Sequence, residues 1–311
     1  MANRVNVGGQ AVIEGVMMKA PRRLCVAVRR PDGGIVVKND PFRPLAQRFK
    51  PLGWPFLRGP VVLGETLVQG LKALGFSARQ ALEEEGEELG SWAFAFTMLA
   101  ALGAGLGLFV ALPHLLSWWL GSWRGFGIDS LAFHLVDGAI KVTLFVAYIW
   151  LISLMGEIRR VFMYHGAEHK SIYCFESGAE LTVENARNHS RLHPRCGTAF
   201  LLVVLLISIL VFAVVLPFVP PVSSVTWLNH LALIGLKVLL MLPIAGVSYE
   251  VIRKAGQKGG KGFWGMLLWP GLQLQRLTTK EPSDDQIEIA LAALKAALET
   301  PESEAPSLRV L

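Results

Sequence analysis

Long hydrophobic runs occupy the middle of the chain and predict membrane-spanning helices. Residues 91–123 contain no charged side chain, and residues 198–236 contain no Asp, Glu, Lys or Arg. A helix of about 20 apolar residues crosses the hydrocarbon core of a bilayer. Since Pro217, Pro220 and Pro221 interrupt the second run, it predicts two helices rather than one. We therefore expect four spans, at about 92–120, 131–156, 198–217 and 226–252.

The ninety residues before the first run follow a different pattern. Residues 24–28 and 35–38 alternate around the turn sequence Pro-Asp-Gly-Gly at 31–34, which is typical of a β-hairpin. Hydrophobic side chains then recur at helical spacing over residues 61–82. We expect residues 1–90 to form a small α+β region that lies on the membrane surface.

The chain after the last span is again different. Residues 259–279 are rich in glycine and aromatic side chains but too short to cross a bilayer, which favours an interfacial or re-entrant segment. Ser283 can cap an amphipathic helix over residues 284–298. Residues 301–311 have the composition of a disordered tail.

Together these patterns predict a mainly α-helical, polytopic membrane protein with about four transmembrane helices. Its composition supports this class, since only 17% of residues are charged, against about 25% in soluble domains, and the mean hydropathy is +0.45. The expected regions are an N-terminal α+β region, a four-helix membrane region and a C-terminal region, at residues 1–90, 91–252 and 253–311. The membrane region includes a histidine-rich segment at residues 157–197.

Lysine and arginine predict the orientation, because short loops rich in these residues stay in the cytoplasm. Residues 1–90 hold thirteen, and residues 157–197 and 253–280 hold six each. The remaining two loops hold only Arg124 between them. Both termini and the histidine-rich segment are therefore expected in the cytoplasm. The net charge of +6 fits this bias and attraction to anionic lipids, so we expect lipid contacts and no nucleic-acid partner.

The histidine-rich segment holds the strongest candidate for chemistry. His165 and His169 are four residues apart, so a helix would place both on one face, with Glu168 beside them. His189, His193 and Cys196 follow, although Pro194 disfavours one continuous helix through them. Imidazole and thiolate are ligands that zinc or iron prefers. The alternative is that these histidines are polar side chains of a loop at the membrane surface.

Three further candidates lie in the regions expected to be cytoplasmic: Glu14 in the N-terminal region, and Arg191 and Arg195 in the histidine-rich segment. Glu14 lies in a glycine-rich stretch that could approach a ligand closely, or could simply form a tight turn before a buried strand. Arg191 and Arg195 could bind a phosphate or carboxylate group, although such residues more often contact lipid head groups.

Charged residues within the spans form a second candidate site. Lys237 falls near the middle of the fourth span, and Asp137 and Lys141 lie one helical turn apart in the second. Because an unpaired charge is costly in a membrane, we expect Lys237 to pair with Asp137, either as a packing ion pair or as part of a proton or ion path. Three more histidines fall near the outer ends of their helices, as single interfacial residues or as an outer metal site: His114, His134 and His230.

Several strings in the chain closely resemble the bacterial YqhQ-like family. They read VGGQAVIEGVMM, YHGAEHK, LTVENARNHSRLHPRCGT and PGLQLQRLTTKEP, and the likeness runs from about Val5 to Leu298. This family is a group of unknown function whose members are often labelled predicted metal-dependent membrane enzymes. The resemblance implies that Glu14, Glu168, Cys196 and the histidines of residues 165–193 belong to signature motifs, without assigning their roles. It also implies a bacterial inner-membrane protein.

These observations lead to one main hypothesis and two alternatives. The main one is a metal-dependent enzyme, hydrolysing a lipid-linked or membrane-apposed substrate, with His165, His169, His193 and Cys196 as ligands and Glu168 or Glu14 as general base. Zinc is the first choice of divalent ion, with iron or manganese as alternatives. The second hypothesis is a scaffold or assembly factor in which the metal is a structural clip. The third is a small transporter built around Lys237 and Asp137, in which case a homo-oligomer would be expected.

Overall fold

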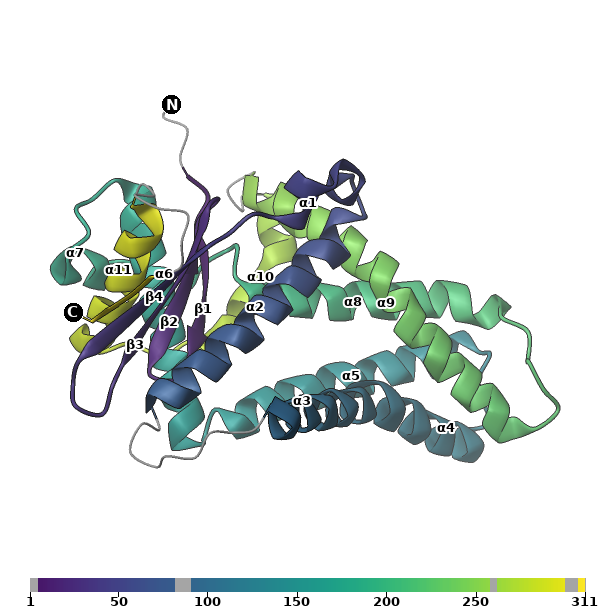
Figure 1. Ribbon diagram of the computed structural model, residues 1–311. Coiled ribbons are helices and arrows are strands. Elements are labelled where there is room, and N and C mark those ends of the chain that lie inside the picture. Colours follow the sequence, from purple (N-terminus) through teal and green to yellow (C-terminus); the bar gives the residue numbers. More distant parts are fainter. Residues whose placement is uncertain (1–4, 82–90, 258–261, 300–306, 311) are drawn as a thin grey trace.

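The computed structural model describes residues 5–81, 91–257, 262–299 and 307–310 (Figure 1). It consists of a β-sheet layered between helices and, beside it, a bundle of long helices. The acidic stretch at residues 83–85 and much of the C-terminal tail lie outside the described residues.

The sheet has five antiparallel strands in the order β1-β2-β3-β4-β5. The four consecutive strands β1 to β4 form most of it as three successive hairpins, and the β3–β4 hairpin confirms the one predicted around residues 31–34. The prediction of a disordered tail is wrong for Ser307–Val310, because these residues pair with β4 at the sheet edge. The strands are β1 Gly8–Val12, β2 Gly15–Lys19, β3 Arg23–Arg29, β4 Ile35–Pro41 and β5 Ser307–Val310.

Helices cover both faces of this sheet because successive strand residues point to opposite sides. Met18 and Cys25 contribute to the core under α6, α7 and α11, whereas Met17 and Val26 face α2. The predicted N-terminal and C-terminal helices are confirmed, and the backbone N–H of Ser283 donates to Gln286 Oε1 at 3.1 Å as α11 begins. The helices of this region are α1 Leu45–Arg48, a 3₁₀ turn Lys50–Gly53, α2 Arg58–Ala81, α6 Gly156–Ser177, α7 Val183–Arg187 and α11 Asp284–Leu298.

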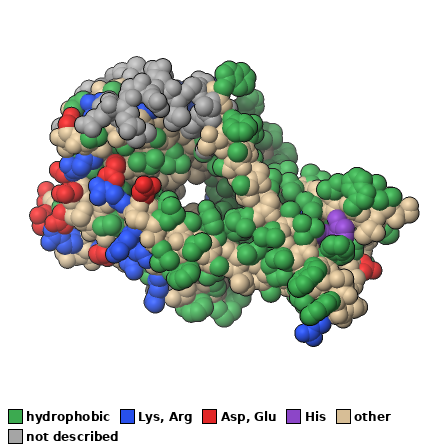
Figure 2. Space-filling model, turned by 90° about the horizontal axis from the view of Figure 1, so that it is seen from below, with side chains coloured by type: hydrophobic (Ala, Val, Ile, Leu, Met, Phe, Trp, Pro, Cys, Tyr) green, Lys and Arg blue, Asp and Glu red, His purple; other side chains and the backbone are tan. Residues whose placement is uncertain are grey.

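Four helices in the described part of the chain are long and apolar enough to cross a membrane, which makes this a membrane protein. They match the predicted spans to within a few residues, although the first contains a π-helical turn. Hydrophobic side chains cover much of their outer surface, whereas charged side chains gather over the sheet-bearing end (Figure 2). The elements are α3 Ser91–Leu106, the π turn Gly107–Ala111, α4 Leu112–Arg124, α5 Leu131–Ile152, α8 Gly197–Val215 with a 3₁₀ turn Leu216–Phe218, and α9 Thr226–Gln257.

Among the described residues, the sheet and the bundle meet where three chain segments pass from one to the other. Helix α6 follows α5 after a short break, and the loop after α7 leads directly into α8. The segment predicted to be interfacial forms a helix, α10 Phe263–Thr278, which packs along α8 with Gly271 against Ala199. On the other side, Arg58 of α2 forms an ion pair with Glu250 of α9. The candidate site lies at this junction.

Candidate metal centre

Three potential metal ligands converge at the junction. The side chains of His165, His169 and Cys196 bring two ring nitrogens and one sulfur within 4.8 Å of one another. The Nε2 atom of His165 lies 3.2 Å from the Cys196 sulfur. Because α6 is continuous through residues 165–169, its two histidines project from one face, as their spacing predicted.

Backbone carbonyls hold both imidazole rings in the orientation that a metal ligand needs. The Nδ1 atom of His165 lies 2.8 Å from the carbonyl oxygen of Thr278, and that of His169 lies 2.5 Å from the carbonyl oxygen of Arg191. A carbonyl oxygen can only accept, so each Nδ1 carries the proton and each Nε2 keeps its lone pair. Burial also lowers the pKa of His169, which favours the neutral ring. Metal-binding histidines are usually held in this way.

Cys196 reaches the two rings from the position just before a membrane-spanning helix. It is the N-cap of α8, so it lies at the positive end of the helix dipole. The preceding loop is fixed by Gln275 of α10, whose side chain accepts from the backbone N–H of His193 and donates to its carbonyl, both at 2.8 Å. Three elements, α6, α8 and α10, therefore set the position of the centre.

Glu168 is a buried carboxyl group beside the three candidate ligands. Its side chain packs against Gly9 of β1, where a Cβ atom would lie 2.8 Å from the Glu168 Cγ. Burial raises the pKa of Glu168, while the neighbouring His165 and His193 and the backbone N–H of Gly9 oppose that rise. The glycine-rich stretch was expected to approach a ligand closely or to form a tight turn, and Gly9 packs closely against this carboxyl group of the same chain.

Gly166 lets the chain after α10 approach α6 closely. A Cβ atom at this position would lie 2.2 Å from the carbonyl oxygen of Lys280. The backbone N–H of Lys280 donates to the carbonyl of Phe162 at 2.8 Å, so the two segments are joined directly. This contact places the neighbouring Thr278 carbonyl against His165.

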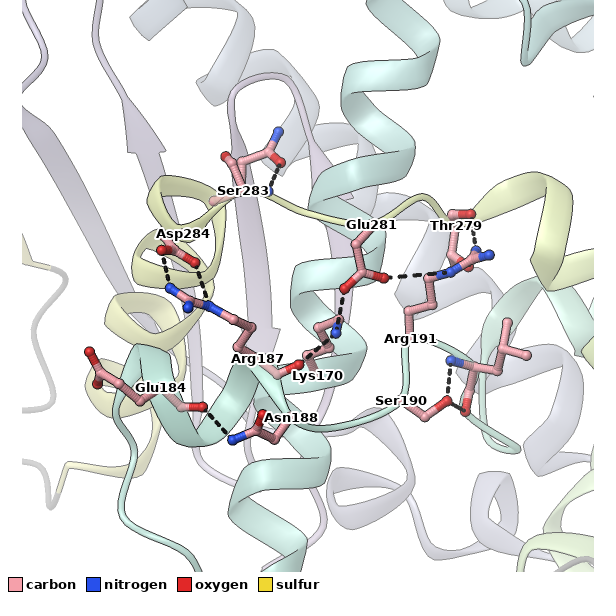
Figure 3. Close-up of polar contacts among 12 residues, drawn as sticks. Lys170, Glu184, Arg187, Asn188, Ser190, Arg191, Thr279, Glu281, Ser283 and Asp284 are labelled. Atoms are coloured by element: carbon pink, nitrogen blue, oxygen red, sulfur yellow. Dashed lines mark hydrogen bonds and ion pairs between the residues drawn. The ribbon is translucent and has the colours of Figure 1, made fainter.

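Ion pairs lock the same C-terminal segment to the loop that carries Arg191 (Figure 3). Lys170 of α6 donates to the carbonyl of Arg187 at 2.8 Å and pairs with Glu281 at 2.6 Å. Arg187 forms an ion pair with Asp284, and Arg191 bonds to Thr279 and lies 3.9 Å from Glu281. These contacts position the carbonyl groups that hold the imidazole rings.

Two predicted ligands have other partners in the structure. The Nε2 atom of His193 lies 3.3 Å from Glu176, and its Nδ1 accepts from the backbone N–H of Arg195. His189 stacks on Tyr173, with ring centroids 6.4 Å apart. His193 thus lies beside His169, at 5.6 Å between ring centroids, but both of its ring nitrogens have partners outside the group of three.

The other predicted site residues also form contacts within the chain. Glu14 lies in the β1–β2 turn with a positive φ of 50° and forms a two-pronged ion pair with Arg160, while Tyr164 donates to it at 3.2 Å. Arg195 forms an ion pair with Glu176.

Within the spans, Asp137 pairs with Lys141 at 2.7 Å and with Lys237 at 2.8 Å, so the expected Asp137–Lys237 pair is present.

Sequence reasoning missed the residues that position the three candidate ligands without belonging to the group. Gln275, Thr278 and Thr279 lie in a stretch that we interpreted only as an interfacial segment, and Glu281 lies just beyond it. A signal was present, because the string PGLQLQRLTTKEP belongs to the same resemblance as the histidine motifs. No spacing rule connects residues more than 80 positions apart, so their contact could not be derived.

Comparisons with known proteins give a family but no activity. The model of the family described as "Protein of unknown function (DUF1385)" matches residues 54–300. The chain is 33% identical over 310 residues to the uncharacterized protein YqhQ of Bacillus subtilis (strain 168), covering 94% of this chain and 92% of that protein. No solved structure matches the chain.

Proposed function

The chain belongs to the DUF1385 family, and we propose that it is a metal-dependent membrane enzyme with its site at the junction of sheet and bundle. One observation carries the proposal: two imidazole Nε2 atoms and a thiol meet within 4.8 Å, with both Nδ1 atoms held by backbone carbonyls. Zinc suits this set of two nitrogens and one sulfur, and iron or manganese are alternatives.

The number of ligands favours catalysis over a structural clip. Structural zinc sites are closed by four protein side chains, whereas catalytic sites use three and keep one position for water or substrate. Among the residues that the structure describes, three side chains form the group. His193 is held by Glu176 instead of completing the set. The scaffold hypothesis would need such a fourth ligand.

The proposed chemistry is hydrolysis at the membrane surface. A divalent ion bound to His165, His169 and Cys196 would polarise a substrate oxygen and lower the pKa of a bound water. Glu168 would accept a proton on its carboxylate and pass it to the leaving group, a role suited to a carboxyl whose pKa burial raises. Since Cys196 begins a membrane-spanning helix, a lipid-linked or membrane-apposed substrate is within reach.

Arg191 and Arg195 serve this proposal by positioning rather than by binding the substrate. Each already has a partner in the chain, Thr279 and Glu281 for Arg191 and Glu176 for Arg195. Glu14, paired with Arg160, is assigned a similar supporting role. We further propose that the site faces the cytoplasm of a bacterial inner membrane with both termini on that side, on the strength of the lysine and arginine distribution.

Elemental analysis of the detergent-purified chain tests the proposal. We expect about one zinc, iron or manganese per chain in the wild type and none in His165→Ala/His169→Ala. His189→Ala is the matched control, because it removes an imidazole of the same segment that lies outside the group of three, and it should keep its metal. A wild type purified without chelator and free of metal would end the proposal, as would a double variant that keeps its metal.

A further inference from the structure

A second cluster of ionisable side chains lies inside the helical bundle, away from the candidate metal centre. None of its members is more than 8% exposed, so they face one another rather than lipid. They come from three of the four spans: His114 of α4, His134, Asp137 and Lys141 of α5, and His230 and Lys237 of α9.

This cluster holds one positive charge more than it can neutralise. The Oδ2 atom of Asp137 accepts from the ammonium groups of both Lys141 and Lys237, at 2.7 and 2.8 Å. The fourth span contributes no compensating charge, since α8 contains no ionisable side chain and offers only the Phe212 ring, 4.9 and 5.8 Å from the two ammonium groups. A net charge inside a membrane is costly, so releasing one proton would relieve this cost.

The hydrogen bonds around Lys237 have a single possible direction. An ammonium group can only donate, so Lys237 donates to Nδ1 of His114, at 3.2 Å. The neutral His114 ring therefore carries its proton on Nε2 and donates it to Nδ1 of His230, at 2.9 Å. The neutral His230 ring then carries its proton on Nε2, a buried atom that meets no partner among the described residues.

We propose that Lys237, His114 and His230 form a proton relay between the centre of the bundle and its end distant from the sheet. His230 lies near the start of α9, at that end of the bundle. In the release step, Lys237 gives one proton to His114 Nδ1, His114 gives its Nε2 proton to His230 Nδ1, and His230 gives its Nε2 proton to water. Lys237 becomes a neutral amine, both rings stay neutral, and Asp137 remains paired with Lys141. The reverse sequence takes the proton up.

The same bonds make a metal site in this place untenable. His114 uses one nitrogen for the Lys237 ammonium and the other for His230, so neither is free for an ion. His134 lies beside the relay but outside it, because neither of its ring nitrogens has a hydrogen-bond partner among the described residues. Of the three bundle histidines, His114 and His230 therefore pass protons along the relay, and His134 does not.

Exchange of the Lys237 ammonium protons with water tests the relay. The full-length protein would carry ¹⁵N-lysine in lipid nanodiscs, with the Lys237 signal assigned by its loss in Lys237→Met. We expect His114→Leu and His230→Leu to slow this exchange at least tenfold at constant pH. His134→Leu is the matched control, since it removes a buried imidazole next to the relay, and it should exchange as the wild type does.

Two further variants keep the test independent of folding defects. His114→Gln and His230→Gln retain a polar side chain that can hydrogen-bond but cannot pass a proton, so they should also slow exchange at unchanged thermal stability. Exchange at the wild-type rate in these variants would overturn the relay and leave an ion pair that only packs the bundle. Equal slowing in His134→Leu would overturn it as well.

Discussion

Three of the seven histidines lie inside the bundle and four lie at its junction with the sheet, and the two groups differ in what holds each ring. At the junction, backbone carbonyls hold Nδ1 of His165 and His169, so both Nε2 atoms keep free lone pairs that converge on Cys196. In the bundle, His114 is held between the Lys237 ammonium and His230. Both ring nitrogens of His114 are therefore hydrogen-bonded to other side chains, and neither is free to bind a metal.

This difference shows that the partner of Nδ1 decides what a buried histidine can do. A carbonyl fixes one tautomer and leaves the other nitrogen free as a metal ligand. A donor such as ammonium reverses the tautomer and turns the ring into a link between two proton-carrying groups. Residue type is the same in the two places, so it would not separate the two roles.

The largest effect is expected from removing the carboxylate of the bundle cluster. Asp137→Leu leaves Lys141 and Lys237 buried without a counter-charge, which should cost about 3–5 kcal/mol of unfolding free energy. Thermal unfolding in detergent measures it. Asp129→Leu, on the exposed loop before α5, is the control and should change stability by less than about 0.5 kcal/mol. An Asp137→Leu protein as stable as the wild type would show that charge does not hold this cluster together.

The junction should respond to acid through His193. Burial lowers the pKa of His193 to about 4, with the Glu168 charge acting in the opposite direction. Because the unfolded chain binds this proton near its ordinary pKa of 6.5, the contribution is complete above pH 6.5 and falls away as the pH drops toward 4. The loss should approach about 3.5 kcal/mol, at about 1.4 kcal/mol per pH unit.

Unfolding at pH 7 and pH 5 in wild type and His193→Asn checks this expectation. Asparagine cannot take up the proton, so the variant should lose less stability between the two pH values than the wild type does. Parallel losses in the two proteins would mean that His193 is not kept neutral by folding.

A smaller effect is expected at Gly166, where the two segments of the junction touch. The added methyl group of Gly166→Ala would meet the Lys280 carbonyl oxygen, which should cost about 2 kcal/mol of stability. Displacing the neighbouring Thr278 carbonyl should also weaken metal binding by about tenfold. Gly156→Ala, in the same helix with nothing within 4 Å, should change neither property. Metal competition with a chelator and thermal unfolding give the two readings.

The sequence predicted the spans, the hairpin and the flanking helices because each depends on a local pattern. Uninterrupted apolar runs, the Pro-Asp-Gly-Gly turn and the spacing of His165 and His169 are each visible within one continuous stretch of the chain. The Asp137–Lys237 pair was predictable for another reason. A charged side chain within a span needs a partner of opposite charge, and the predicted spans contain few charged residues.

The contacts between distant segments could not be predicted in this way. The strand Ser307–Val310 looks like a disordered tail in isolation and becomes ordered only because β4 offers an open edge. His193 was expected to complete the ligand set, but its ring nitrogen bonds to Glu176 and its backbone is held by Gln275. Such contacts depend on packing between elements rather than on spacing along the chain.

X-ray absorption at the metal edge tests the central claim most directly, because it counts the ligands of the metal. For zinc in the wild type we predict two nitrogens at about 2.0–2.1 Å, one sulfur at about 2.3 Å and one further light atom from solvent. Cys196→Ser should lose the sulfur signal, and His193→Asn should leave the spectrum unchanged. A spectrum without sulfur, or one that changes in His193→Asn, would contradict the assignment of the centre to His165, His169 and Cys196.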